Sequence, residues 1–221
     1  MTTTTPTTHR KDYTARSSFT LTRPNNSVVT FTFDFDPSRP NATRLTLPPN
    51  SSWTPDPHWH ERYTEYVRCV SGRLLVRLDG VDRVVTPADG PQTIEKFVVH
   101  EFMRADAYGY AGEGEEEDVV VEEWTEPGDG VKQVFFRNLL GVLEDREYWG
   151  RWFMVQLLLT CSRYDNYNVM VGGWGKWAAT HCFYAVVEGV ARVAGLKAWY
   201  EEYTPVRYRA AAEGTQEKKV V

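Results

Sequence analysis

The first half of the chain repeats one pattern, in which short segments of alternating apolar and polar residues are separated by Gly, Pro and Asp. From Val29 to Phe35 every second residue is aromatic or aliphatic, which is typical of a half-buried strand. The dipeptide Asp79-Gly80 joins two further segments, 73–78 and 81–86, and favours a two-residue hairpin turn. Many short strands with frequent turns predict a mainly β fold, either a sandwich or a closed barrel.

The second half changes to a helical period. After Pro127 apolar residues recur at helical spacing, which predicts helices over about 131–143, 147–161 and 176–196. The charge divides in the same way: residues 145–221 carry 10 Lys and Arg against 8 Asp and Glu, whereas the first 144 residues carry 15 against 22. We therefore expect a disordered arm over 1–16, a β-barrel over 17–126, C-terminal helices over 127–205 that pack on the barrel or form a dimer interface, and a flexible tail over 206–221.

Composition excludes several classes of function. The net charge of -5 argues against a nucleic-acid-binding protein, which normally carries a basic patch. The Thr-rich N-terminus lacks the apolar segment of a signal peptide, and no run of 18 uncharged apolar residues occurs. We therefore expect a cytoplasmic protein with reduced cysteines. The apolar helical faces leave three locations open: the parent barrel, which is favoured, a homodimer interface, or a membrane surface.

Two of the chain's five histidines lie in the segment 53–72, as His58-x-His60. Residues two apart on a strand point to the same side, so both imidazoles would face one interior at a spacing that lets them share a metal ion. The next strand begins at Glu65, and its alternation with Val67 and Cys69 places the carboxylate inward as well. A third histidine, His100, shares a strand face with apolar residues, which also predicts an interior position.

Three imidazoles and one carboxylate form a mixed nitrogen and oxygen ligand set that suits divalent Fe, Mn, Ni, Cu or Zn. The ligand type does not choose among these metals. If all four residues bind, an octahedral metal keeps two open positions for water, oxygen or substrate. If Glu65 stays outside the coordination sphere, the three histidines resemble an open catalytic zinc or iron site.

The spacing of these residues resembles the first motif of the cupin superfamily, G-x5-H-x-H-x3-4-E-x6-G. The matching residues are His58, His60, Glu65 and Gly72, and Ser52 replaces the leading Gly. In the second motif, G-x5-P-x-G-x2-H-x3-N, His100 matches, but Glu95, Phe97 and Arg104 replace Pro, Gly and Asn. The resemblance covers about residues 28–125. It implies a small jelly-roll barrel with metal ligands His58, His60, Glu65 and His100, and it favours a homodimer.

The chain also resembles small, single-domain fungal cupins associated with secondary metabolism, through KQVFFRNLL after the barrel and WYEEYTP near the end. This resemblance implies a small aromatic or polyketide-like substrate. The favoured function is a metal-dependent enzyme, with Fe(II) and oxygen (dioxygenase) chemistry slightly ahead of a non-redox isomerase, cyclase or dehydratase. A non-enzymatic barrel that binds a small ligand is the alternative.

Other residues near the motif are candidates for substrate contact or acid–base work. Glu61 follows His60 and could act as an acid or base beside Glu65, although a solvent-facing turn residue is the simpler interpretation. Arg104 could pair with a substrate carboxylate or be a charge at the barrel rim. Cys69 could form a pocket wall or be a small buried hydrophobe. The predicted substrate-binding residues are Phe33, Trp59, Tyr63, Cys69, Phe102 and Arg104.

Overall fold

A computed structural model of the chain describes residues 9–110, 112 and 114–217. The chain divides into two compact units. The first, which we call the strand unit, consists of Ser17–Asp129 together with the short segment Asp165–Val169. The second, the helical unit, contains Gly130–Tyr164 and the described residues before Ser17 and after Val169. After Asp129 the chain therefore passes from the strand unit into the helical unit, returns to the strand unit for Asp165–Val169, and then continues in the helical unit.

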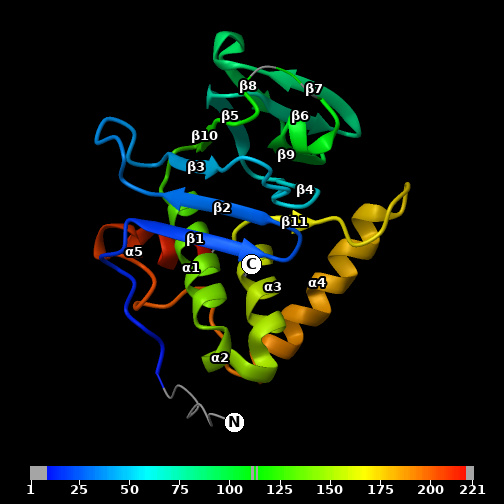
Figure 1. Cartoon of the computed structure of the whole chain (residues 1–221). Helices are drawn as coiled ribbons and strands as arrows, with labels where there is room; N and C mark the ends of the chain where they lie inside the picture. Colours follow the sequence, from blue (N-terminus) through cyan, green and yellow to red (C-terminus); the bar gives the residue numbers. More distant parts are fainter. Residues whose placement is uncertain (1–8, 111, 113, 218–221) are drawn as a thin grey trace, which may run out of the picture. The chain divides into compact units, whose positions relative to one another are not determined.

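The strand unit is built from two antiparallel sheets (Figure 1). The six-stranded sheet has the order β1 (Ser18–Arg23), β2 (Ser27–Thr32), β3 (Thr43–Leu47), β10 (Val119–Glu126), β5 (Thr64–Ser71) and β8 (Pro91–Ile94). The five-stranded sheet has the order β11 (Tyr167–Asn168), β4 (His58–Trp59), β9 (His100–Arg104), β6 (Leu74–Leu78) and β7 (Val81–Val85). Two antiparallel sheets with non-sequential neighbours are the arrangement expected of a jelly roll, and the predicted mainly β fold with a helical C-terminal part is confirmed.

Alternation along the strands produces the core. In β5, Glu65, Val67 and Cys69 are buried while the residues between them are half-buried, as the period of two requires. Trp53 connects the two sheets, because its ring lies 5.9 Å from that of Phe31 on β2 and 6.0 Å from that of Phe102 on β9. The interior of the strand unit is therefore the space between the sheets.

Two turns in the strand unit depend on positive φ angles. The hairpin between β6 and β7 has φ of 46° at Asp79 and 83° at Gly80, which matches the predicted Asp-Gly turn. The second turn follows β8, which ends at Ile94, and leads into β9. Phe97 has φ of 68° there, in the region that favours glycine, and it stands where the cupin motif has Gly. Its N–H donates to the carbonyl of His60 at 2.6 Å, which holds the turn in place.

The helical unit contains α1 (Val131–Glu144), α2 (Arg146–Trp149), α3 (Phe153–Arg163), α4 (Lys176–Val193) and α5 (Arg209–Glu217). The single helix expected over 147–161 is broken between α2 and α3. The break contains Gly150, whose φ of 47° does not continue a right-handed helix. Across the ranges that the structure describes, no helix combines the length and the apolar composition needed to cross a bilayer.

Both predicted terminal segments differ from expectation where the structure describes them. In the arm expected to be disordered over 1–16, Tyr13 is buried and its hydroxyl donates to Asp145 at 3.0 Å. Within the predicted flexible tail over 206–221, a short 3-10 turn and α5 form instead, and Tyr208 and Ala212 are buried. These apolar residues supply the buried contacts that a solvated tail would lack. Residues 1–8 and 218–221 lie outside the described part of the chain.

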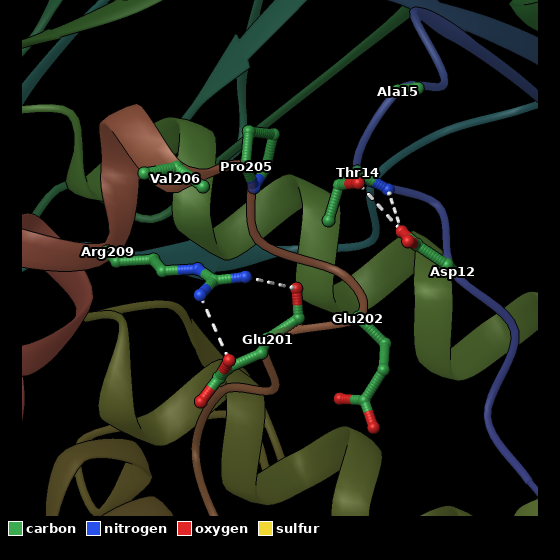
Figure 2. Close-up of a pocket in the computed structure, with 8 residues that line it drawn as sticks. All are labelled: Asp12, Thr14, Ala15, Glu201, Glu202, Pro205, Val206 and Arg209. Carbon is green, nitrogen blue, oxygen red and sulfur yellow. Dashed lines mark hydrogen bonds and ion pairs between the residues drawn. The ribbon is translucent and has the colours of Figure 1, made fainter.

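The helical unit carries a pocket of about 410 Å³ (Figure 2). Its carboxylates already have partners within the unit: Asp12 accepts hydrogen bonds from Thr14, and Glu201 accepts one from Arg209 at 2.9 Å. The third carboxylate, on Glu202, accepts a hydrogen bond at 2.6 Å from a nearby arginine. None of the predicted site residues lines this pocket.

Candidate metal centre

Four side chains of the predicted ligand set meet between the two sheets. His58, His60, Glu65 and His100 each offer one ligand atom, and these atoms all lie within 4.8 Å of one another. His58 on β4 pairs directly with His100 on β9, His60 follows β4, and Glu65 comes from β5 of the other sheet. No more than 5% of any of these four residues is exposed to solvent. The fold therefore brings together the four residues that the spacing of the motif predicts as ligands.

Each imidazole is held by a backbone carbonyl. The three Nδ1 atoms lie within hydrogen-bond distance of carbonyl oxygens: His58 with Asp56 at 2.8 Å, His60 with Asp165 at 2.5 Å, and His100 with Val98 at 3.0 Å. Because a carbonyl oxygen only accepts, Nδ1 carries the hydrogen and Nε2 keeps its lone pair. Histidines that bind metals are oriented in this way, with the second ring nitrogen donating to a carbonyl or carboxylate.

The buried carboxylate makes a cation at this place favourable. Glu65 is fully buried, with Oε2 2.9 Å from Nε2 of His60 and Oε1 3.4 Å from Nε2 of His100. Among the described residues, Nε2 of His100 has no hydrogen-bond partner. A buried carboxylate facing imidazole lone pairs requires a positive charge between them, which either a proton or a metal ion supplies. The donor set of nitrogens and one oxygen suits a divalent transition metal, so the cluster fits the ion that the motif implies.

The pKa of His58 supports the same conclusion. Burial, followed by the neighbouring imidazoles of His100 and His60, lowers the pKa of His58 well below its usual 6.5. His58 is therefore neutral at physiological pH, and only a neutral imidazole can donate its lone pair to a metal ion.

Trp59 and Glu61 lie on the other side of the ligand segment. Trp59 is fully buried and stacks on Tyr167 of β11, with ring centroids 5.7 Å apart. Its indole N–H donates to the carboxylate of Glu61 at 3.1 Å. The four-residue cluster does not include Glu61. The geometry therefore directs Glu61 toward Trp59 and favours the turn role over acid–base work at the centre.

The other predicted contact residues occupy different parts of the strand unit. Phe102 lies two positions after His100 on β9, is buried, and is the one of this group beside a ligand on its own strand face. Phe33 packs edge-on against Phe19 at 6.0 Å, and the hydroxyl of Tyr63 donates to Asp129 at 2.9 Å. Burial raises the pKa of Cys69 to about 11, so its thiol is a small buried hydrophobe rather than a nucleophile.

Arg104 has a structural role in place of the predicted contact with a substrate carboxylate. It is fully buried, and its guanidinium donates to the carboxylate of Asp106 at 3.0 Å. The same group donates to the carbonyls of Leu47 at 3.0 Å, Glu117 at 2.8 Å and Glu115 at 2.8 Å. Its donors are thus occupied by the protein, which leaves it no free face for a substrate.

Sequence reasoning missed Asp165, which lies in the polar run SRYDNYN between two helices. Its carbonyl accepts the hydrogen of His60 Nδ1, although the two residues are 105 positions apart. No local pattern marks such a residue, because neither strand parity nor motif spacing extends across that distance. Only the pairing of β11 with β4 brings it to the site.

Comparison with known proteins gives partial matches. No family model matches the chain. Over 63 residues it is 38% identical to a protein named "Probable oxidoreductase patJ" in Aspergillus clavatus, which covers 28% of this chain and 20% of that protein. An oxidoreductase of Arthrobotrys oligospora is 28% identical over 107 residues, 48% of this chain and 40% of the relative. The chain therefore spans between a fifth and two-fifths of the length of these relatives.

Similar solved structures include a predicted oxalate decarboxylase from Thermotoga maritima, at 14% identity and a TM-score of 0.38, covering 52% of this chain and 96% of that one. A cupin domain of a transcriptional regulator from Enterobacter cloacae has 17% identity and a TM-score of 0.31, covering 50% and 96%. Independently of these comparisons, the motif residues of this chain converge between two antiparallel sheets.

Proposed function

We propose that this chain, a cupin by its motif and its two-sheet fold, is a metal-dependent enzyme that transforms a small aromatic or polyketide-like molecule. The observation that carries the proposal is the buried cluster of three imidazoles and one carboxylate, with ligand atoms within 4.8 Å of one another. Without a metal ion, a cluster of this kind would need a proton to compensate its buried carboxylate.

The residues of the centre have separate tasks in this proposal. His58, His60 and His100 present their Nε2 atoms to the centre, and Glu65 supplies the negative charge and an oxygen that can hold a proton. When bound, a divalent metal at such a site supplies Lewis acidity, or one-electron chemistry with oxygen if it is iron. Phe102 and Trp53 pack together in the apolar interior of the strand unit, and aromatic side chains of this kind commonly line sites for aromatic substrates.

We favour Fe(II) and oxygen chemistry over a non-redox isomerisation, cyclisation or dehydration. Support for the redox branch comes from the fungal relatives, two of which are named oxidoreductases. A role in secondary metabolism is part of the same proposal and rests on the resemblance to fungal cupins described above.

Metal content tests the first step. Protein purified without chelators is analysed by inductively coupled plasma mass spectrometry, and we expect about one transition metal ion per chain. The variants His58→Ala and His100→Ala should lose the metal, whereas His181→Ala, on the exposed face of α4, should retain it. A metal-free wild type, or equal metal content in all variants, would refute the proposed centre.

Oxygen uptake tests the second step. Protein loaded with Fe(II) is mixed with a panel of aromatic and polyketide-like molecules, and both substrate loss and oxygen consumption are recorded. We expect the two to occur together in the wild type and to be absent in His58→Ala. Substrate loss without oxygen consumption supports the non-redox alternative. Ligand binding without turnover and indifferent to chelators supports a binding barrel instead.

A further inference from the structure

The three imidazoles differ in what holds them. His58 and His100 bond to carbonyls of Asp56 and Val98, each only two residues earlier in the chain, so their orientation is fixed by their own turns. His60 bonds instead to the carbonyl of Asp165, 105 positions later, at 2.5 Å. The orientation of His60 therefore depends on a segment that does not belong to the motif.

Asp165 holds the ligand turn through its side chain as well. Its carboxylate accepts hydrogen bonds from the backbone N–H of Glu61 at 3.1 Å and of Arg62 at 2.8 Å. The residue is 1% exposed and has φ of 62°, a left-handed conformation that Asp, Asn and Gly tolerate best. Asp165 thus bonds to three successive residues: its carbonyl accepts from the imidazole of His60, and its carboxylate accepts from the backbone N–H groups of Glu61 and Arg62.

The segment Asp165–Val169 is anchored along its length to the strand that precedes the ligand turn. Tyr167 pairs with Trp59 and stacks on its ring, and the N–H of Val169 donates to the carbonyl of Pro57 at 2.9 Å. Residues on both sides of this segment belong to the helical unit. The chain thus makes a five-residue excursion whose hydrogen bonds end on the metal-ligand segment.

We propose that Asp165 is a positioning residue that fixes the tautomer of His60 and directs its Nε2 toward Glu65 and the other imidazoles. The inference rests on the proposed metal centre for its consequence, which is tight metal binding. The tautomer of His60 does not depend on a bound metal, because the hydrogen bond from Nδ1 to the carbonyl of Asp165 forms within the protein itself. Partners of this kind typically contribute 10–100-fold to metal affinity.

Two substitutions separate the carboxylate from the backbone conformation. Asp165→Gly keeps the left-handed conformation without strain but removes the carboxylate. Asp165→Asn also tolerates this conformation and keeps one acceptor oxygen for the N–H groups. The matched control is Asp34→Gly, because Asp34 has a similar φ of 57° but is exposed and is not a member of the cluster.

Two readouts are taken on full-length protein. The first is the ¹⁵N spectrum of the imidazoles in the metal-free chain, which reports the tautomer of each histidine. The second is titration with Co(II), followed by its visible absorption, which reports both affinity and coordination. Urea unfolding of each metal-free variant shows whether folding is retained, and Asp165→Ala, which also lacks an acceptor oxygen on its side chain, replaces Asp165→Gly if the latter does not fold.

We expect Asp165→Gly to mix the tautomers of His60, to weaken Co(II) binding about 10–100-fold and to change the visible spectrum. The Co(II) affinity of Asp165→Asn should stay within about threefold of that of the wild type, and the affinity of Asp34→Gly should equal that of the wild type. Wild-type tautomer and affinity in Asp165→Gly, or an equal loss in Asp165→Asn, would overturn the proposal. A wild type that binds no Co(II) defeats the metal centre, and the tautomer measurement then decides the role of Asp165 alone.

Discussion

Glu122 in the middle of β10 provides the sharpest test of how the strand unit is held together. Its carboxylate is fully buried and meets Arg39 at 2.7 Å, Arg44 at 2.8 Å and Arg68 at 3.0 Å. Arg44 and Arg68 lie directly across from it on β3 and β5, so the cluster joins the strand that carries Glu65 to its neighbours. The perturbation is Glu122→Gln, which keeps the shape and removes the charge.

The expected loss in the free energy of unfolding follows from these contacts. The hydrogen bonds from Arg39 and Arg44 then end on an uncharged amide oxygen in place of a carboxylate, which weakens each by about 1 kcal/mol. The ion pair with Arg68 adds less than about 1 kcal/mol, because that side chain is 39% exposed and solvent screens it. We therefore expect a loss of about 2 kcal/mol in the free energy of unfolding, or about 1 M in the urea midpoint.

The pKa of Glu122 predicts how the stability difference between wild type and Glu122→Gln changes with pH. Burial alone would raise the pKa of Glu122, but hydrogen bonds from Arg39 and Arg44 outweigh it and hold the pKa below its ordinary value of 4.5. A lowered pKa in the folded state contributes stability that is present above 4.5 and is lost as the pH falls through the folded-state pKa. The difference between wild type and Glu122→Gln should therefore be largest at neutral pH and disappear in acid.

Urea unfolding at several pH values, followed by circular dichroism, measures this difference. Glu116→Gln, in an exposed loop, is the matched control and should unfold like the wild type at each pH. Equal stability of wild type and Glu122→Gln at neutral pH, or a difference that does not change with pH, would refute the reasoning.

Three further outcomes are expected. Metal added to chelator-treated protein at 100 times its dissociation constant should stabilise it by about 2.7 kcal/mol, seen as a rise in Tm that His58→Ala abolishes. A thiol reagent should modify exposed Cys182 rapidly but Cys69, with its pKa raised to about 11, only after unfolding. Gly141→Ala should cost about 1–3 kcal/mol in urea unfolding, because its Cβ would lie 2.5 Å from an aromatic ring, whereas Gly189→Ala on exposed helix should be neutral or stabilising.

The ligand set could be read from the sequence because its geometry is local. The spacing of His58 and His60 and the alternation that turns Glu65 inward need only the period of a strand. The same period located most of the strands, and the Asp79-Gly80 dipeptide located one hairpin. Apolar periodicity likewise located α1, α3 and α4, but it missed α5 and did not show the break at Gly150, which depends on backbone angles that many sequences allow.

Tertiary structure decided the partners of these residues. Arg104 looks like a site residue in the sequence, yet its guanidinium is bonded to the carbonyls of Leu47, Glu115 and Glu117, which no spacing rule brings near it. Asp165 carries no signal at all, and it reaches His60 only because β11 pairs with β4. Short-range sterics and solvent exposure act on residues that are close in the chain, so they produce a periodic pattern in the sequence. Long-range hydrogen bonds depend on the folded path of the backbone and produce no such pattern.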